Sequence, residues 1–396
     1  MSASLALLSL ASLATIEDAE TGNEERPHPR VEMLEQHKAP ADPLSVDIAY
    51  TGEIMVNARG GARRGSRYMD NFDIVVGADL DALLGWEGAT AGLYGLYNNG
   101  RSISDLVRDA QGVSNIEAGV SAIRLYEAWL DQKFGDHISL RAGLYDLNSE
   151  FDVLDTASLF VGSGHGIGTD FGQSGRNGPS IFPSTSLAAR LAVEPAEGWV
   201  VRAALLDAVP GNPDHPSRTA IRFGKGEGAL LVGEVQAPVA GGKFLLGHWR
   251  YSASFDRIDG TGTGKGNSGT YLRAEFTLAD HGGGRLDGFG RIGIANGNYN
   301  DFSRFVGAGV TISDWISGRE GDVLGVAVAA AFTSSPLRRR DGADRAEVAL
   351  EMTYRAPLAD WLAIQPSIQY IFNPSADPSI ASALVFGLRS EIAFGL

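Results

Sequence analysis

The most regular alternation of hydrophobic and polar side chains lies between residues 346 and 355. Apolar or small side chains occupy every second position, at Ala346, Val348, Leu350, Met352 and Tyr354. The positions between them are mostly polar or charged, at Glu347, Ala349, Glu351, Thr353 and Arg355. A period of two places the two sets on opposite faces of an extended chain. The pattern therefore predicts a β-strand with one apolar and one polar face.

Two further segments of this kind follow, over residues 362–373 and 384–394. Each has about ten residues or more, whereas ordinary strands have roughly five to six. Tilted strands of about 9–11 residues have the length needed to cross a bilayer. A large soluble β-sandwich would also show alternation. We favour a transmembrane antiparallel β-barrel, with its apolar face in lipid and its polar face on a lumen.

The alternation recurs from residue 47 onward and predicts about sixteen strands, an even number as in bacterial single-chain barrels. Short connections (135–136, 195–198, 238–242) alternate with long ones (98–119, 148–185, 208–226), and residues 58–69 are expected to form a Gly/Arg-rich loop. Aromatic residues occur at both strand ends, at Trp86, Trp199, Trp315 and Trp361 near short turns and at Tyr97, Tyr145, Tyr251 and Phe372 near long loops. Both regularities are typical of outer-membrane barrels.

The N-terminal residues have a different character. Residues 1–14 contain a short leucine-rich stretch that ends in Ser12-Leu13-Ala14, which predicts a signal peptide and its cleavage site. Residues 15–45 are acidic, contain proline and lack periodicity, so we expect a flexible leader. The barrel domain is then expected to span residues 46–396.

Composition narrows the possible functions. The chain has 33 Lys and Arg against 48 Asp and Glu, a net charge of −15, which argues against a nucleic-acid partner. It has no cysteine, which excludes disulfides and thiolate metal sites. Its 51 glycines suit tight turns and closely spaced strands. We expect no metal and no cofactor.

Several segments resemble the carbohydrate-selective porins of the Gram-negative outer membrane. They are SGRNGPSIFP at residues 174–183, LYEAWL at 125–130, SLRAGLYD at 139–146, and the segment from Trp361 to Pro374. The resemblance extends from about Tyr50 to Phe394. It implies a sixteen-stranded outer-membrane barrel that passes monosaccharides such as glucose by facilitated, passive diffusion. The implied partners are small sugars, outer-membrane lipid and lipopolysaccharide, and the barrel-assembly machinery; a monomer and a homo-oligomer both remain open.

The connection over residues 148–185 is too long to serve only as a connector. Four phenylalanines are spread along it, at Phe151, Phe160, Phe171 and Phe182. Exposing four such side chains on an external loop would be unfavourable. We therefore expect the loop to fold into the lumen and narrow a barrel that would otherwise hold a wide channel. A disordered external loop is the alternative.

Sugar selectivity requires hydrogen-bond partners for hydroxyl groups, which arginines and carboxylates together provide. Strand parity predicts a basic inner wall of Arg141, Arg190 and Arg202, with Glu53, Asp73, Asp79 and Asp81 on the far side. Within the long loop, the candidate constriction residues are Asp152, Asp170, Arg176 and Asn177. The alternative is a generic hydrated lumen whose charges pair with one another.

Other functional classes have weaker support. A less selective general-diffusion porin fits the same fold. An outer-membrane hydrolase would require a nucleophile or activated water beside a histidine and an acid, and only His165 and His248 are candidate lumen histidines. A structural or adhesin barrel is a further alternative. The GTGTGKG segment at 260–266 lacks the Ser or Thr and the strand–helix context of a phosphate-binding loop, so we expect an outer loop there.

Overall fold

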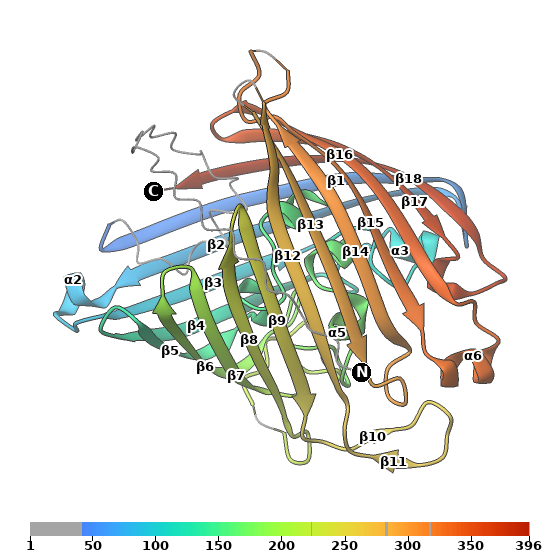
Figure 1. The fold of residues 1–396 in the computed structure, drawn as a ribbon, viewed down its shortest axis with the longest axis horizontal. Helices are drawn as coiled ribbons and strands as arrows, with labels where there is room; N and C mark the ends of the chain where they lie inside the picture. Colours follow the sequence, from blue (N-terminus) through green and yellow to red (C-terminus); the bar gives the residue numbers. More distant parts are fainter. Residues whose placement is uncertain (1–41, 223, 282–283, 317, 396) are drawn as a thin grey trace, which may run out of the picture.

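The computed structural model describes residues 42–222, 224–281, 284–316 and 318–395. It shows a closed antiparallel barrel in which β1 pairs with β18, together with a separate two-stranded hairpin, β10–β11 (Figure 1). The barrel contains sixteen strands in the order β1, β18 to β12, then β9 to β2, which confirms the predicted fold class. The predicted signal peptide (1–14) and most of the predicted leader (15–45) lie outside the described residues, although β1 already begins at Leu44.

The strand bounds are as follows. The first half of the barrel contains β1 (Leu44–Gly61), β2 (Gly65–Asp79), β3 (Ala89–Asn98), β4 (Ala122–Phe134), β5 (Ile138–Tyr145), β6 (Ser186–Ala196), β7 (Trp199–Asp207), β8 (Ala229–Val239) and β9 (Gly242–Tyr251). The hairpin contains β10 (Phe255–Asp256) and β11 (Thr263–Gly264). The second half contains β12 (Ser268–His281), β13 (Gly284–Ala295), β14 (Phe302–Ser313), β15 (Val323–Thr333), β16 (Ala346–Ala359), β17 (Leu362–Phe372) and β18 (Ala381–Gly395).

The alternation in the sequence becomes an inside and an outside of the barrel. In β16, Glu347 and Glu351 are 0% and 2% exposed, whereas Leu350 and Met352 are 43% and 49% exposed. The other strands repeat this division, with leucine, isoleucine, valine and phenylalanine on the outer face. An apolar outer band and a polar interior are the arrangement that lipid and water impose on a transmembrane barrel. No helix among the described residues is long and apolar enough to span a membrane.

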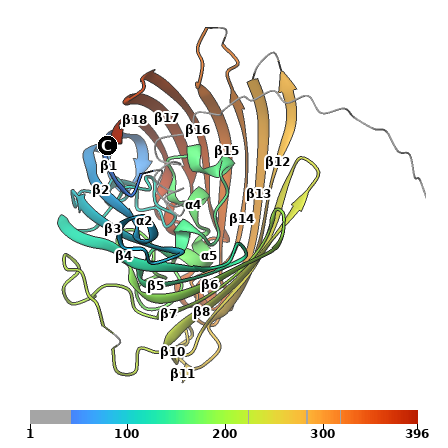
Figure 2. The same cartoon turned by 90° about the vertical axis from the view of Figure 1, so that its left-hand side faces the viewer.

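The connections between strands are mostly short at one end of the barrel and mostly long at the other. Figure 1 shows the short helix α2 (Leu80–Leu84) at one end and α6 (Ser335–Asp341) at the other. The long connections contain α3 (Ser104–Val107), η1 (Leu147–Ser149), η2 (Thr156–Leu159), α4 (Ser163–Gly166), α5 (Thr169–Gly172) and η3 (Pro374–Ala376). Figure 2 shows α4 and α5 inside the ring of strands rather than above it.

The structure corrects two local predictions. Residues 58–69 are mostly strand, because β1 and β2 are joined by a tight turn in which the Asn57 side chain donates to the Gly60 and Arg63 carbonyls. Strand β2 ends at Asp79, whose carboxylate caps α2, and Asp81 lies in that helix rather than on the inner face of a strand. In β4, a bulge at Tyr126 changes the parity of the strand, so inward and outward positions exchange after it.

The aromatic residues at strand ends follow the prediction only in part. Trp86, Trp199, Trp315 and Trp361 are all between 43% and 52% exposed near the short connections, as an interfacial girdle requires. Tyr97 and Phe372 are exposed near the long ones. Tyr145 and Tyr251 are each only 1% exposed and point into the interior, so their assignment to the girdle was wrong.

Candidate solute pathway

The long loop between β5 and β6, residues 146–185, fills part of the lumen. Phe151, Phe160 and Phe171 are at most 1% exposed. The Phe171 ring stacks on Trp249 of β9, with ring centroids 5.0 Å apart and an interplanar angle of 8°. This β5–β6 loop therefore has its own apolar contacts with the inner wall, which confirms the prediction that it folds inward.

Two barrel arginines hold the β5–β6 loop by its carboxylates. Arg291 of β13 lies 2.7 Å from an oxygen of Asp152 and 2.7 Å from an oxygen of Asp170. Arg273 of β12 lies 3.4 Å from Asp152 and donates to the carbonyls of His165 and Gly166. Because all four charged side chains are at most 1% exposed, each pair must be nearly complete to offset its desolvation.

Barrel carboxylates also accept backbone amides of the same loop. The two oxygens of Glu351 accept the N–H groups of Val161 and Gly162 at 2.7 and 2.9 Å. Glu234 accepts the N–H of Asp152 at 2.9 Å, and Glu275 accepts that of Thr156 at 3.0 Å. The loop amides thereby obtain the partners that buried backbone requires.

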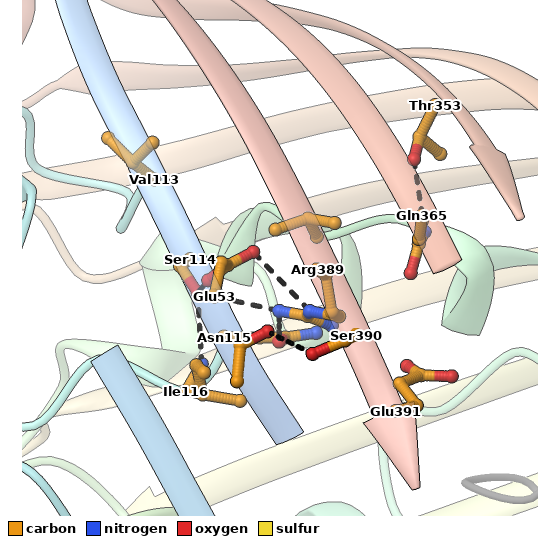
Figure 3. Close-up of polar contacts among 12 residues, drawn as sticks. Glu53, Val113, Ser114, Asn115, Ile116, Thr353, Gln365, Arg389, Ser390 and Glu391 are labelled. Carbon is orange, nitrogen blue, oxygen red and sulfur yellow. Dashed lines mark hydrogen bonds and ion pairs between the residues drawn. The ribbon is translucent and has the colours of Figure 1, made fainter. Parts of the chain in front are cut away.

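The loop between β3 and β4, residues 99–121, is held in the same manner by residues of β16, β18 and β1. Glu347 of β16 accepts the N–H groups of Ala110 and Gln111 at 2.7 and 3.0 Å. Figure 3 shows Arg389 of β18 directed at this loop, where it donates to the Asn115 side chain at 2.8 Å. The predicted site residue Glu53 completes the group, since it accepts the Ser114 hydroxyl at 2.5 Å and lies 3.3 Å from Arg389.

The two inward loops are also joined to each other. The Asn115 N–H donates to the Val161 carbonyl at 2.8 Å, and the Ser163 N–H donates to the Gly112 carbonyl at 3.0 Å. Val161 packs in one apolar cluster with Leu106 and Val113 of the β3–β4 loop. The two loops therefore form one connected constriction across the lumen.

Burial shifts the pKa of a titratable group in each loop toward the uncharged form. Burial raises the pKa of Glu117 to about 7, and the nearby Asp109 carboxylate adds to the shift. Burial lowers the pKa of His165 to about 3, and the Arg273 charge adds to that shift. At neutral pH His165 is therefore uncharged, although Glu351 lies 3.6 Å away.

The three arginines of the predicted basic wall lie in two separate places. Arg141 and Arg190 are direct neighbours on β5 and β6, and both contact the same Asp131 oxygen, at 2.9 and 2.8 Å. Arg190 also contacts Glu150 at 2.7 Å, and the Arg141 guanidinium lies 3.8 Å from the Trp129 ring centre. Arg202 instead lies 3.5 Å from Glu234 on β8 and does not join them.

The remaining predicted site residues are scattered. Asp152 and Asp170 hold the β5–β6 loop, as described above. Arg176 is exposed, donates to the Ser254 carbonyl at 3.4 Å and lies 6.0 Å from the Phe255 ring. Asn177 donates to the Pro210 carbonyl at 2.8 Å. His248 faces outward with Leu246 and contacts Thr270, so the suggestion that it lines the lumen was wrong.

Sequence reasoning missed the docking role of Arg273, Arg291, Glu347 and Glu351. Each lies on the polar face of an alternating strand, so parity identifies these residues as inward. Their partners are loop groups more than a hundred residues away in the chain, for example Asp152 for Arg291. No local signal in the sequence connects such pairs.

One part of the lumen remains hollow. A cavity lies against β1–β4 and β18, bounded on the loop side by Ile116, Asp146 and Phe182. Among its described lining residues are the side chains of Asp73 and Tyr94. The inward direction predicted for Asp73 is therefore confirmed, and a solute pathway has space on this side of the constriction.

The comparison with protein families agrees with this architecture. The model of the carbohydrate-selective porin, OprB family, matches residues 63–394. The chain belongs to this family. It is thus a carbohydrate-selective porin of the Gram-negative outer membrane, and family membership implies a channel rather than an enzyme.

Relatives and solved structures extend over nearly the whole porin. Porin B of Pseudomonas aeruginosa is 24% identical over 423 residues, covering 92% of this chain and 89% of that protein. The high-pH structure of Pseudomonas putida OprB has a TM-score of 0.79 at 20% identity, covering 92% of this chain and 96% of its own. A triple mutant of the Rhodopseudomonas blastica porin has a TM-score of 0.55 at 11% identity, covering 89% and 100%. These structural similarities show the barrel fold.

Proposed function

We propose that this porin passes monosaccharides such as glucose by passive diffusion, through the space between the two inward loops and strands β1–β4 and β18. The observation that carries the proposal is the pair of hydrogen-bonded loops, which fill part of the lumen beside a polar, aromatic-lined cavity. An unobstructed barrel of this size would hold a wide aqueous channel. A narrowed passage discriminates among solutes by their size and by the contacts that their hydroxyl groups make.

Within this proposal, the charged residues have two roles. Arg141 and Arg190 lie on the inner wall at β5 and β6 and are not among the lining residues of the cavity, and we expect them to offer donors to sugar hydroxyls as a solute passes. Arg141 retains one buried Nη1 without a hydrogen-bond partner among the described residues. Glu53 and Arg202, with Asp152 and Asp170, shape the constriction by holding loops and neighbouring strands. Arg176 and Asn177 sit at its edge, and Asp79 lies outside it.

We also propose that this porin is not an enzyme. His165 lies within the β5–β6 loop, with its ring centroid 4.9 Å from that of Phe160 and with Glu351 beside it. His248 points away from the lumen. Neither histidine is placed beside a solute in the cavity described above. The apolar outer band further supports contact with outer-membrane lipid and lipopolysaccharide and insertion by the barrel-assembly machinery.

Swelling of proteoliposomes in sugars of increasing size tests the proposed function. Purified porin should admit glucose and other hexoses rapidly, disaccharides much more slowly, and trisaccharides at the rate of empty liposomes. Equal rates for hexoses and disaccharides would instead support a general-diffusion porin. No uptake of any sugar would contradict a sugar channel altogether.

A further inference from the structure

The outer surface of the barrel has basic and polar side chains at one end of β9, β12 and β14. The strand register aligns His248, Thr270, Ile294 and Arg304 in one row across β9, β12, β13 and β14. Arg250 lies two positions further toward the end of β9, and all five side chains are exposed. This is the end of the barrel that bears the β10–β11 hairpin (Figure 1), and the long connections mark it as the external end.

These side chains lie at the edge of the apolar outer band. The positions that alternate with them point inward and are at most 1% exposed, at Trp249, Tyr271 and Phe305. The next outward row, two residues further into the barrel, is entirely apolar and between 38% and 54% exposed, at Leu246, Leu272, Ile292 and Val306. A basic row directly above an apolar one lies at the height of lipid headgroups.

The two outward arginines differ from the arginines inside the barrel. Arg273 and Arg291 in the lumen contact carboxylates of the β5–β6 loop. Among the residues that the structure describes, Arg250 and Arg304 have neither an ion pair nor a hydrogen bond from their guanidiniums. The chain as a whole has a net charge of −15, so these two positive charges stand out against an acidic protein. Basic side chains at a bilayer surface gain free energy from anionic headgroups.

The spacing of this group matches a headgroup with more than one anionic substituent. Three strand spacings separate β9 from β14, which places Arg250 and Arg304 about 15 Å apart at their backbones. Between them, the His248 Nδ1 lies 2.9 Å from the Thr270 hydroxyl. A disaccharide that bears a phosphate at each end can reach both guanidiniums and place its hydroxyl or amide groups over His248 and Thr270. Guanidinium binds phosphate with two parallel hydrogen bonds.

We propose that Arg250 and Arg304, with His248 and Thr270 between them, form a binding site for the phosphorylated headgroup of lipopolysaccharide in the outer leaflet. The acyl chains of the same lipid lie on the apolar row below. This headgroup site is separate from the sugar pathway, and it rests on the proposed contact of the outer band with outer-membrane lipid.

Binding of fluorescently labelled lipopolysaccharide to purified porin in an uncharged detergent tests the site. Each basic residue near an anionic surface contributes about fivefold in affinity, so Arg250→Gln combined with Arg304→Gln should bind about thirtyfold more weakly than wild type. Arg250→Lys combined with Arg304→Lys keeps both charges and should stay within about threefold of wild type. Arg63→Gln combined with Arg64→Gln is the matched control, because it removes two exposed charges from the β1–β2 turn at the same end of the barrel, and it should bind as wild type does.

Two further ligands identify the group that is bound. Lipopolysaccharide whose phosphates have been removed should bind wild-type porin about as weakly as the intact lipid binds the Arg250→Gln, Arg304→Gln variant. Phosphatidylglycerol, which has a single phosphate and no disaccharide, should bind wild type at least tenfold more weakly than lipopolysaccharide. Glucose uptake and the heat-modifiable mobility of the variant should equal those of wild type, since both arginines lie on the outer face. If the double variant does not fold, the two single variants and the dephosphorylated lipid still decide the question.

The outcomes separate this site from the proposed function. Wild-type affinity for intact lipopolysaccharide in the Arg250→Gln, Arg304→Gln variant would overturn the site, as would equal binding of intact and dephosphorylated lipid by wild type. Equal affinities for phosphatidylglycerol and lipopolysaccharide would also overturn it, in favour of a general anionic-lipid surface. Wild-type porin that binds lipopolysaccharide as predicted but admits no sugar would contradict the proposed passage and leave the headgroup site in place.

Discussion

Two pairs of buried arginines inside the barrel obtain their counter-charges in different ways. Arg273 and Arg291, on β12 and β13, are neutralised by Asp152 and Asp170, which both belong to the β5–β6 loop. Arg141 and Arg190, on β5 and β6, share Asp131 from the neighbouring strand β4. The first pair is complete only when the loop is in place, whereas the second has a partner supplied by the barrel wall itself.

This difference indicates that the inward-facing arginines have two different roles in the same lumen. The arginines on β12 and β13 are docking sites for a loop, because undocking would remove Asp152 and Asp170 from them. The arginines on β5 and β6 keep Asp131 whether or not the loop is docked, so they can act on solutes as part of a fixed wall. Changes to the first pair should alter pore size, and changes to the second should alter selectivity.

Asp152→Ala should produce the largest effect of a single substitution. Removing one partner of a buried charged group costs about 3–5 kcal/mol, and both Arg273 and Arg291 lose a contact. We expect partial release of the β5–β6 loop, seen as a higher and noisier single-channel conductance and faster proteolysis within residues 146–185. Asp155→Ala is the control on the same loop, because the Asp155 side chain is 68% exposed; equal behaviour of the two variants would contradict the docking role.

Acid should loosen the same loop through His165. The pKa of His165 is lowered to about 3 by burial, so the docked loop holds this side chain neutral while the released loop would protonate it below about 6.5. The contribution of neutral His165 to the stability of the docked loop is thus fully present above pH 6.5 and declines as the pH falls toward 3. At pH 5 the loss is about 2 kcal/mol.

The His165→Gln variant isolates this contribution. Its change in conductance noise between pH 7.5 and pH 5 should be smaller than that of the wild type. The raised pKa of Glu117, about 7, favours the β3–β4 loop as the pH falls from 7 toward 4.5, but this contribution is common to both proteins. Identical pH profiles for the two proteins would show that His165 does not control docking.

Arg141→Ala combined with Arg190→Ala should produce a smaller effect, confined to selectivity. Both guanidiniums lie on the lumen face and offset nearby acids, so their loss should shift the reversal potential toward cation selectivity. Sugar binding should weaken about tenfold rather than vanish, since a hydrogen bond to a charged donor contributes roughly 1.5–3 kcal/mol at most. A reversal potential and glucose block equal to wild type would remove these arginines from the pathway.

The sequence specified the barrel better than its interior. Strict alternation around Glu347 and Glu351 correctly identified which side chains face inward, because lipid and water separate the two faces of every strand. Parity failed beyond the end of β2, where Asp81 lies in a helix that Asp79 caps. It gives no single facing for β4, because a bulge at Tyr126 changes the parity within that strand. The phenylalanines of the β5–β6 loop indicated that it enters the lumen. Its docking partners depend on closure of the barrel, which brings Asp152 to Arg291.

The most direct test of the account concerns the β5–β6 loop as a whole. Residues 151–178 can be replaced by a short Gly-Ser linker that leaves Pro183 and β6 unchanged, with deletion of residues 259–262 at the exposed tip of the β10–β11 hairpin as the control. Single-channel conductance in a planar bilayer is the measurement, with sugar-dependent liposome swelling recorded on the same protein. We predict a severalfold higher conductance and loss of discrimination between hexoses and disaccharides in the loop variant, with the control unchanged. Wild-type conductance and wild-type sugar discrimination in the loop variant would contradict the claim that this loop constricts the pore.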